Sequence, residues 1–184
     1  MLVSLTKEEV RMCADMALNR WLMKWGSTDR ENYAGENKKK LEPEIAANVR
    51  AIVAEYAVAK HYKLPHVVPF YPNNEHYYRK DIPDVLNNIE VRTVRTRDAA
   101  PVWKKDNRPH LIIVGTHVVD KDYYSEVDIY GWIPAEECFK DEWYWAPEDS
   151  WRVPKEAFSS EPLGKVFIPL QTLMSSDGVT VGAH

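Results

Sequence analysis

Apolar residues recur at helical spacing near the start of the chain, from Val10 to Trp25. Thr6 and Glu9 precede them as a capping box, in which the threonine hydroxyl accepts from the Glu9 amide and the glutamate reaches back. Gly26 follows, and glycine commonly ends a helix. The pattern therefore predicts an amphipathic first helix, and the polar stretch after it, up to residue 40, predicts a loop.

A second, alanine-rich helix is predicted over residues 42–62, ending before Pro65. It is apolar around most of its circumference, which predicts that it packs against a sheet. Three polar residues break this pattern, namely Glu44, Asn48 and Glu55. Their separations of four and seven residues place them along one stripe of the helix.

The rest of the pattern predicts strands. Four runs of strand-like residues cover 81–86, 89–96, 111–119 and 127–133, and an edge strand is expected at 165–170. Asn87-Asn88 predicts a tight turn between the first two runs, because asparagine tolerates positive φ. The link 120–126 is short enough for another hairpin, and 134–143 is read as a short helix. We expect one α/β or α+β domain with a mixed central sheet of about four to five strands flanked by helices.

Composition places the chain among ordinary globular proteins. Its 184 residues are 45% hydrophobic and 28% charged, with a formal net charge of −4. The sequence contains no apolar run of membrane-spanning length, no secretory signal at its start, and two distant cysteines, which together predict a protein of the reducing cytoplasm without a membrane partner. It lacks the glycine motifs of dinucleotide enzymes, P-loop ATPases and serine hydrolases.

Charge is unevenly distributed along the chain. Residues 90–110 include three acidic and six basic residues. The basic residues are Arg92, Arg95, Arg97, Lys104, Lys105 and Arg108. Residues 120–149 include ten acidic residues and only two lysines. One face of an anionic protein is therefore expected to be cationic.

The candidate chemistry lies around the predicted Asn87-Asn88 turn. The turn would bring Asp84 beside Glu90, and strand alternation places Arg92 on the same side as Glu90. Two carboxylates, the carbonyl of Val91 and waters are the oxygen ligands that Mg²⁺ prefers. A cation beside them suits a phosphodiester, whose transition state gathers negative charge. Asp81 is the alternative ligand if the strand register differs.

These residues resemble a known signature. Pro83-Asp84 followed by Glu90-Val91-Arg92 is similar to the motif of the PD-(D/E)xK nuclease superfamily, which has the restriction-endonuclease-like fold. Glu55 matches the glutamate that this family carries on a helix ahead of the motif, and Leu111–Val114 matches the buried strand after it. The run 130–134 is similar to a late strand of small phage-type members.

The resemblance implies a nuclease-like core over residues 42–134, with residues 1–40 as an N-terminal helix and loop and 135–184 as a tryptophan- and proline-rich extension. It implies a Mg²⁺- or Mn²⁺-dependent nuclease that hydrolyses DNA, in the host cytoplasm if a phage encodes it. Asp84, Glu90 and the Val91 carbonyl would hold the ion, and Glu55 would hold a second ion or orient water. The predicted nucleic-acid contacts are Arg95, Arg97, Lys104, Lys105 and His110.

Two departures from the family pattern leave alternatives open. The usual lysine is Arg92, which can stabilise negative charge but cannot act as a general base. The link 120–126 is also too short for the helix that the family commonly has between its third and fourth strands. Two alternative functions stay open: a nuclease fold that binds nucleic acid without cleaving it, and an acidic protein-interaction domain. A homodimer also stays open as the oligomeric state. Trp143, Trp145 and Trp151 would either stack on bases or pack the extension onto the domain.

Overall fold

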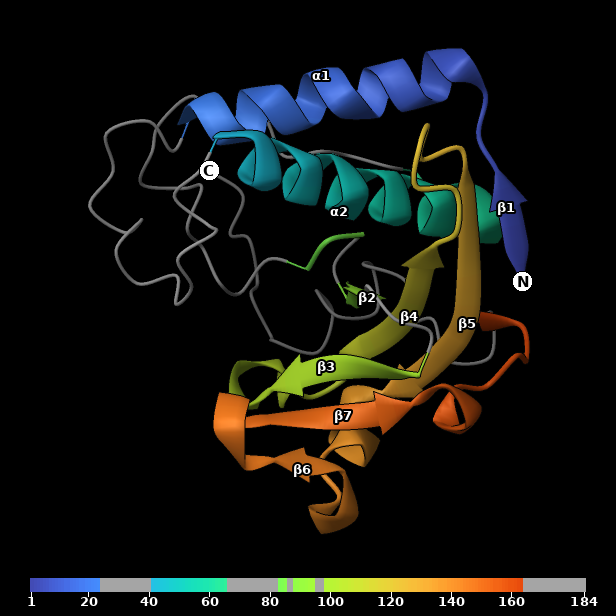
Figure 1. The fold of residues 1–184 in the computed structure, drawn as a ribbon. Coiled ribbons are helices and arrows are strands. Elements are labelled where there is room, and N and C mark those ends of the chain that lie inside the picture. The colour runs from blue at the N-terminus through green and yellow to red at the C-terminus, as the bar shows by residue number, and fades with distance from the viewer. Residues whose placement is uncertain (24–40, 66–82, 86–87, 95–97, 164–184) are drawn as a thin grey trace, which may run out of the picture.

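The computed structural model describes residues 1–23, 41–65, 83–85, 88–94 and 98–163. They form a mixed α+β structure in which two long helices lie on one side of a four-stranded sheet and a three-stranded sheet lies on the other (Figure 1). The elements are β1 (Leu2–Ser4), α1 (Lys7–Met23), α2 (Leu41–Tyr62), β2 (Ile89–Val94), β3 (Ala99–Trp103), β4 (Ile112–Val118), β5 (Glu126–Pro134), β6 (Tyr144–Trp145) and β7 (Ser150–Pro154). Short 3₁₀ helices include η3 (Lys104–Asp106), η4 (Ala135–Cys138) and η5 (Asp141–Trp143).

The four-stranded sheet has the order β1-β5-β4-β2. β4 and β5 form the expected antiparallel hairpin, and β1 adds to β5 in antiparallel orientation. β2 runs parallel to β4, with Glu90 beside Ile113 and Val94 beside His117. Parallel neighbours need a crossover connection. In the described part of that crossover the chain forms β3 and η3 rather than an α-helix.

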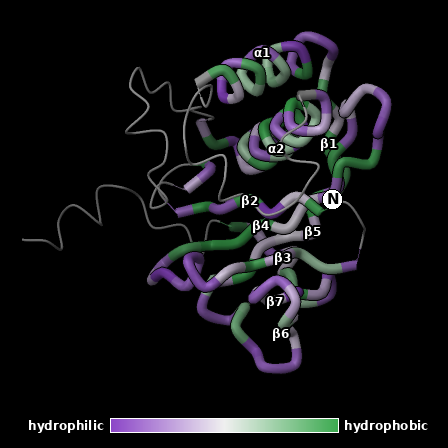
Figure 2. Tube along the Cα trace, turned by 60° about the vertical axis from the view of Figure 1, so that its left-hand side comes forward, coloured by the Kyte–Doolittle hydropathy of each residue, from purple (hydrophilic) through white to green (hydrophobic). Residues whose placement is uncertain are grey.

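The helices form two successive layers over this sheet, as Figure 2 shows. α2 lies directly on the strands, because its Ile52, Val53, Ala57 and Val58 are fully buried in the core that it shares with them. α1 packs on the outer side of α2 through a second apolar stripe that includes Cys13. Burial of these apolar side chains, worth roughly 1.5–3 kcal/mol for each large one, holds the layers together.

The opposite face of the central sheet is covered by the sheet β3-β7-β6. A second apolar core lies between the two sheets, including Val102 of β3, Ile113 of β4 and Val153 of β7. The backbone at Ser159 packs closely against Gly131 of β5. A Cβ atom on Gly131 would lie 2.1 Å from the Ser159 carbonyl oxygen. Only glycine fits this approach, because the backbone there also has a φ of +139°.

Most predicted helices and strands are confirmed where the structure describes them. Both long helices form, and the strand runs 89–96, 111–119 and 127–133 appear as β2, β4 and β5. Of the run 81–86 the structure describes 83–85, in which Val85 forms an isolated bridge with Ile89. Gly26 and the predicted strand 165–170 lie outside the described residues.

One expectation is wrong, and several strands were not predicted. Residues 134–143 form 3₁₀ turns rather than one short helix. The central sheet has helices on one face only within the described ranges, because β3, β6 and β7, which the pattern did not predict, cover the other. β1 was also not predicted, since three residues are too few to show alternation. None of the described helices is long and apolar enough to cross a bilayer.

Candidate active site

Asp84 lies at the outer edge of β2. The bridge between Val85 and Ile89 turns the chain back on itself, with hydrogen bonds of 3.0 and 3.2 Å between the two backbones. Asp84 Oδ2 then accepts from the Val91 amide at 2.9 Å. The N–H and C=O of one strand residue point the same way, so the Val91 carbonyl also faces the edge where Asp84 lies.

Glu90 and Arg92 lie on one face of β2, as strand alternation predicts. Arg92 Nη1 lies 2.8 Å from Glu90 Oε1, and Arg108 Nη2 lies 3.5 Å from Glu90 Oε2. The Glu90 residue is only 7% exposed, so both charges of the first pair are largely removed from water. Val91 between them packs into the core under α2.

Asp106 fixes Arg92 from the crossover. Its Oδ1 accepts from Arg92 Nη2 at 2.6 Å, and its Oδ2 accepts from the Trp103 amide at 2.9 Å. The guanidinium also lies 5.2 Å from the centre of the Trp103 ring, within the range of a cation–π contact. Asp106 and Trp103 therefore belong to the site, although no motif in the sequence marks them.

Glu55 approaches from α2 and is 4% exposed. Arg20 of α1 binds it through two parallel hydrogen bonds of 3.0 and 3.1 Å. The two other polar residues on the same stripe make local contacts: Glu44 accepts from the Trp21 indole at 3.1 Å, and Asn48 donates to the Glu44 carbonyl. Of the three, only Glu55 takes part in the site.

Asp84 and Glu90 hold their protons more tightly than carboxyl groups in water do. Burial, reinforced by the charge of Glu55, raises the pKa of Asp84 to about 6, although Arg92, the Val91 amide and Arg20 oppose the rise. Burial, reinforced by the charge of Asp84, raises the pKa of Glu90 to about 7. Burial alone would lower the pKa of Arg92, but the surrounding carboxylates raise it, so the guanidinium stays charged.

The four predicted catalytic residues thus form one electrostatically connected group. Asp84 interacts with Glu55 on one side and with Glu90 on the other, and Arg92 interacts with both Asp84 and Glu90. Within the described residues, however, no three acidic, histidine or cysteine side chains are arranged to hold a metal ion. The donor set of carboxylates and a backbone carbonyl nevertheless suits a hard divalent cation. The raised pKa values show that added positive charge would be favourable there.

The predicted nucleic-acid contacts fall into two groups. Lys104 and Lys105 are exposed on η3, and the charge of Lys105 acts on Glu90. His110 is exposed in the turn before β4, with a positive φ of 63°. Arg95 and Arg97 lie outside the described residues, and so does the alternative ligand Asp81.

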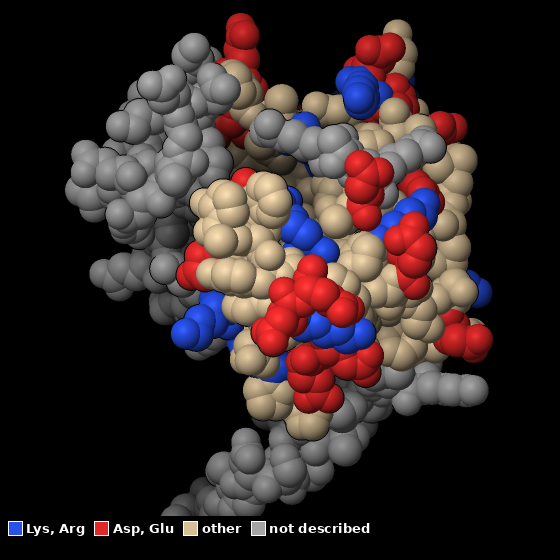
Figure 3. Space-filling model, turned by 60° about the horizontal axis from the view of Figure 1, so that its bottom comes forward, with Lys and Arg blue, Asp and Glu red and all other residues tan. Residues whose placement is uncertain are grey.

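The acidic segment 120–149 contributes β5 to the central sheet and β6 to the second sheet. Figure 3 shows acidic side chains gathered on the side of the molecule that carries the second sheet, with basic ones between them. Trp151 packs against Phe139 and Tyr144, and Lys140 lies over Trp143. Trp145 is 49% exposed, so it is the member of the predicted stacking set with the most surface available. Base stacking by these residues stays a prediction.

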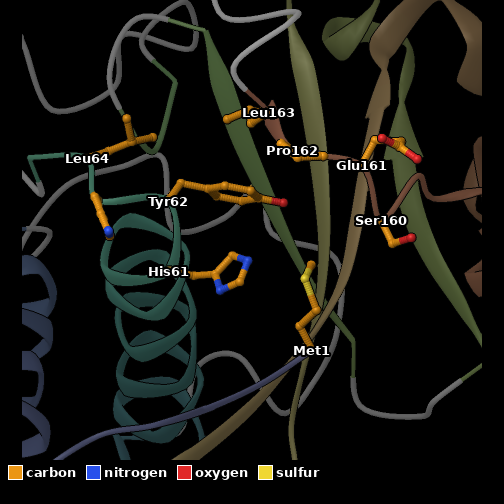
Figure 4. Close-up of a pocket in the computed structure, with 9 residues that line it drawn as sticks. Met1, His61, Tyr62, Leu64, Ser160, Glu161, Pro162 and Leu163 are labelled. Atoms are coloured by element: carbon orange, nitrogen blue, oxygen red, sulfur yellow. The ribbon is translucent and has the colours of Figure 1, made fainter.

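A cavity of about 470 Å³, which none of Asp84, Glu90 and Glu55 lines, lies at the C-terminal end of α2 (Figure 4). Tyr62 and His61 of α2 point toward Met1 and toward residues 160–163. Burial raises the pKa of Tyr62 to about 12. None of the predicted site residues lines this cavity.

Comparison of the chain with protein-family models, with curated proteins and with solved structures finds no match. The geometry of the site and the sequence resemblance therefore carry the functional proposal.

Proposed function

We propose that the protein is a Mg²⁺-dependent nuclease that hydrolyses phosphodiester bonds of DNA, with a restriction-endonuclease-like core formed by α2, the Val85–Ile89 turn, β2 and β4. The observation that carries the proposal is the hydrogen bond from the Val91 amide to Asp84, which ties Asp84 to the strand of Glu90 and Arg92. The interaction of Asp84 with the helix residue Glu55 supports it.

Each residue has a defined role in this proposal. Asp84, Glu90 and the Val91 carbonyl would hold the ion, and Mn²⁺ could replace Mg²⁺ because it accepts the same oxygen ligands. Such an ion, when bound, makes a water molecule more acidic and offsets the charge of the phosphate. Arg92 would donate to a phosphate oxygen and stabilise its developing charge. It cannot take a proton from water, which leaves Glu55 as the candidate to orient that water.

The arginine pairs have a consequence for this mechanism. Arg20 occupies Glu55, while Arg92 and Arg108 approach Glu90. Buried carboxylates repel one another and lose contact with water, and both effects are unfavourable. The arginine contacts offset these costs. Binding of a divalent ion would replace part of this compensation, and Arg92 would then turn from Glu90 toward the substrate.

The test is cleavage of single-stranded, duplex and branched DNA in Mg²⁺ or Mn²⁺, with and without a chelator. Cleavage that the chelator stops and that Glu90→Ala and Asp84→Asn abolish is the expected result. Glu142→Gln, which alters an exposed carboxyl on η5, is the matched control and should cleave like the parent protein. Cleavage that persists unchanged in Glu90→Ala would refute the assignment of the site.

A second candidate function is nucleic-acid binding without turnover. It is favoured by the commitment of Arg92 to two carboxylates, Glu90 at 2.8 Å and Asp106 at 2.6 Å. In that case DNA binding weakens steeply as salt rises, and Lys105→Gln reduces it, while no divalent ion produces cleavage. Cleavage by the parent protein separates the two functions. Arg92→Lys, which places a lysine at the family's usual position, would retain or raise cleavage in an active nuclease.

A further inference from the structure

Trp103 lies at the end of β3, outside the apolar cores. The residues of β3 alternate between two faces, and Ala100 and Val102 are buried in the core between the two sheets. Trp103 projects to the other face and is partly exposed. Among the described residues its ring packs against neither apolar core, unlike the rings of Trp132 and Trp143. A large aromatic side chain outside the core is therefore available to a ligand.

The Trp103 ring lies beside the candidate catalytic groups. β2 and β3 each lie at one end of the strand order of their sheet, and Asp106 joins them by accepting from Arg92 and from the Trp103 amide. The Arg92 guanidinium lies 5.2 Å from the centre of the ring and 2.8 Å from Glu90. Within the described ranges the ring has no second aromatic or cationic partner. One nucleotide can therefore contact both the ring and Arg92.

Two lysines follow the ring directly. Lys104 and Lys105 begin η3 and are exposed. In the part of the chain that the structure describes, no carboxylate forms an ion pair with either lysine, and the charge of Lys105 acts on Glu90. The next residue, Asp106, is buried and fixes the backbone of η3. The two exposed charges thus extend from a fixed turn, as contacts to the phosphates of a nucleic acid require.

The acidic residues nearest the ring along β7 have partners of their own. Glu148 and Asp149 come just before the residue of β7 that pairs with Trp103. Glu148 forms an ion pair with Arg152 at 2.6 Å, and Asp149 accepts from the Tyr144 hydroxyl at 2.8 Å. The ion pair offsets one of these two charges, which reduces the repulsion of a polyanion on this side of the ring.

We propose that Trp103 stacks on an unpaired DNA base, while Lys104 and Lys105 bind the neighbouring phosphates and bring one phosphate to Arg92. The proposal rests on the proposed action of the protein on DNA, and it names the substrate as a strand that is single next to the cleaved bond. Within a duplex the faces of each base are covered by its neighbours, so stacking on an indole requires a base outside the duplex. Every base has an aromatic face, so this contact is tolerant of sequence.

Binding to oligonucleotides in a chelator tests the proposal without any cleavage. A fluorescein-labelled oligothymidine is compared by anisotropy with an oligonucleotide of the same length in which abasic positions replace every base. Both carry the same phosphates, so the ratio of their affinities measures what the bases contribute. The parent protein is expected to bind the oligothymidine about tenfold more tightly, a loss typical of one stacked base.

Substitutions assign this preference to the ring. Trp103→Leu is expected to remove the preference for bases, and Trp103→Phe to retain most of it. Lys105→Gln is expected to weaken both oligonucleotides equally and to reduce the salt dependence of binding by about one phosphate contact. Tyr123→Leu is the control, because it removes an aromatic ring that is 77% exposed in the link between β4 and β5, and it should bind like the parent protein.

Fluorescence gives a second readout in a variant that keeps an aromatic ring. Oligothymidine should quench the tryptophan fluorescence of the parent protein, and Trp103→Phe should lose this quenching.

Two results would overturn the proposal, whatever the cleavage assay shows: a parent protein without a preference for bases, or a preference and quenching that both Trp103 variants retain. Loss of the preference in Trp103→Leu supports the proposal even if no divalent ion produces cleavage, in which case the nuclease function alone fails.

Discussion

Glu90→Gln is expected to change how stability depends on pH. The pKa of Glu90 rises from its ordinary value of 4.5 to about 7 in the folded protein, because burial and the charge of Asp84 disfavour the ionised form. Between pH 4.5 and 7 the unfolded chain has lost this proton and the folded protein has kept it, so stability falls as pH rises. A shift of this size at about 1.4 kcal/mol per pKa unit corresponds to about 3 kcal/mol at most.

The measurement is the free energy of unfolding in urea, followed by tryptophan fluorescence at half-unit steps from pH 5 to pH 8. The parent protein should lose stability across this range, and Glu90→Gln should lose about 2–3 kcal/mol less, because glutamine does not ionise. Glu142→Gln, on the exposed η5, is the control and should follow the parent curve. Parallel curves for the parent protein and Glu90→Gln would refute the view that a buried, crowded Glu90 resists ionisation.

Three further substitutions test the packing around the site by the same urea unfolding. Arg20→Met leaves the buried Glu55 carboxylate without its bidentate partner and should cost about 2–4 kcal/mol; a loss under about 0.5 kcal/mol would contradict the ion pair. Gly131→Ala places a Cβ against the Ser159 carbonyl at positive φ and should cost about 2 kcal/mol or more, so a neutral result would contradict this close approach. Thr6→Ala removes the cap of α1 and should cost about 1 kcal/mol, whereas Thr6→Ser should restore most of it.

The parts of the fold that the sequence predicted are those with a strong local signal. The capping box before α1 forms as expected: the Thr6 amide donates a hydrogen bond of 2.8 Å to Glu9 Oε2. The continuous apolar run of β4 also predicted a buried strand, and every residue of that strand is buried. The second sheet was missed, because Pro101 interrupts β3, Pro154 ends β7, and both strands are only five residues long.

In the site, too, the sequence predicts residues that have a local signal and misses those that do not. Spacing and resemblance predict Asp84, Glu90, Arg92 and Glu55. Their partners Arg20, Arg108 and Asp106 are brought to them only by the tertiary fold. A signal for Arg20 was nevertheless present, since it follows Cys13 by seven residues and therefore lies on the buried stripe of α1.

Asp106 links the candidate chemistry to the outermost part of the fold. The strand just before it, β3, is held in register by five residue pairs with β7, which comes much later in the chain. A protein shortened after β5 would keep every acidic residue of the predicted metal set. It would lose β7, which pairs with the strand before Asp106, the hydrogen-bond partner of Arg92. The smallest unit able to support the proposed chemistry would therefore extend at least to Pro154, well beyond the segment that carries the sequence signature.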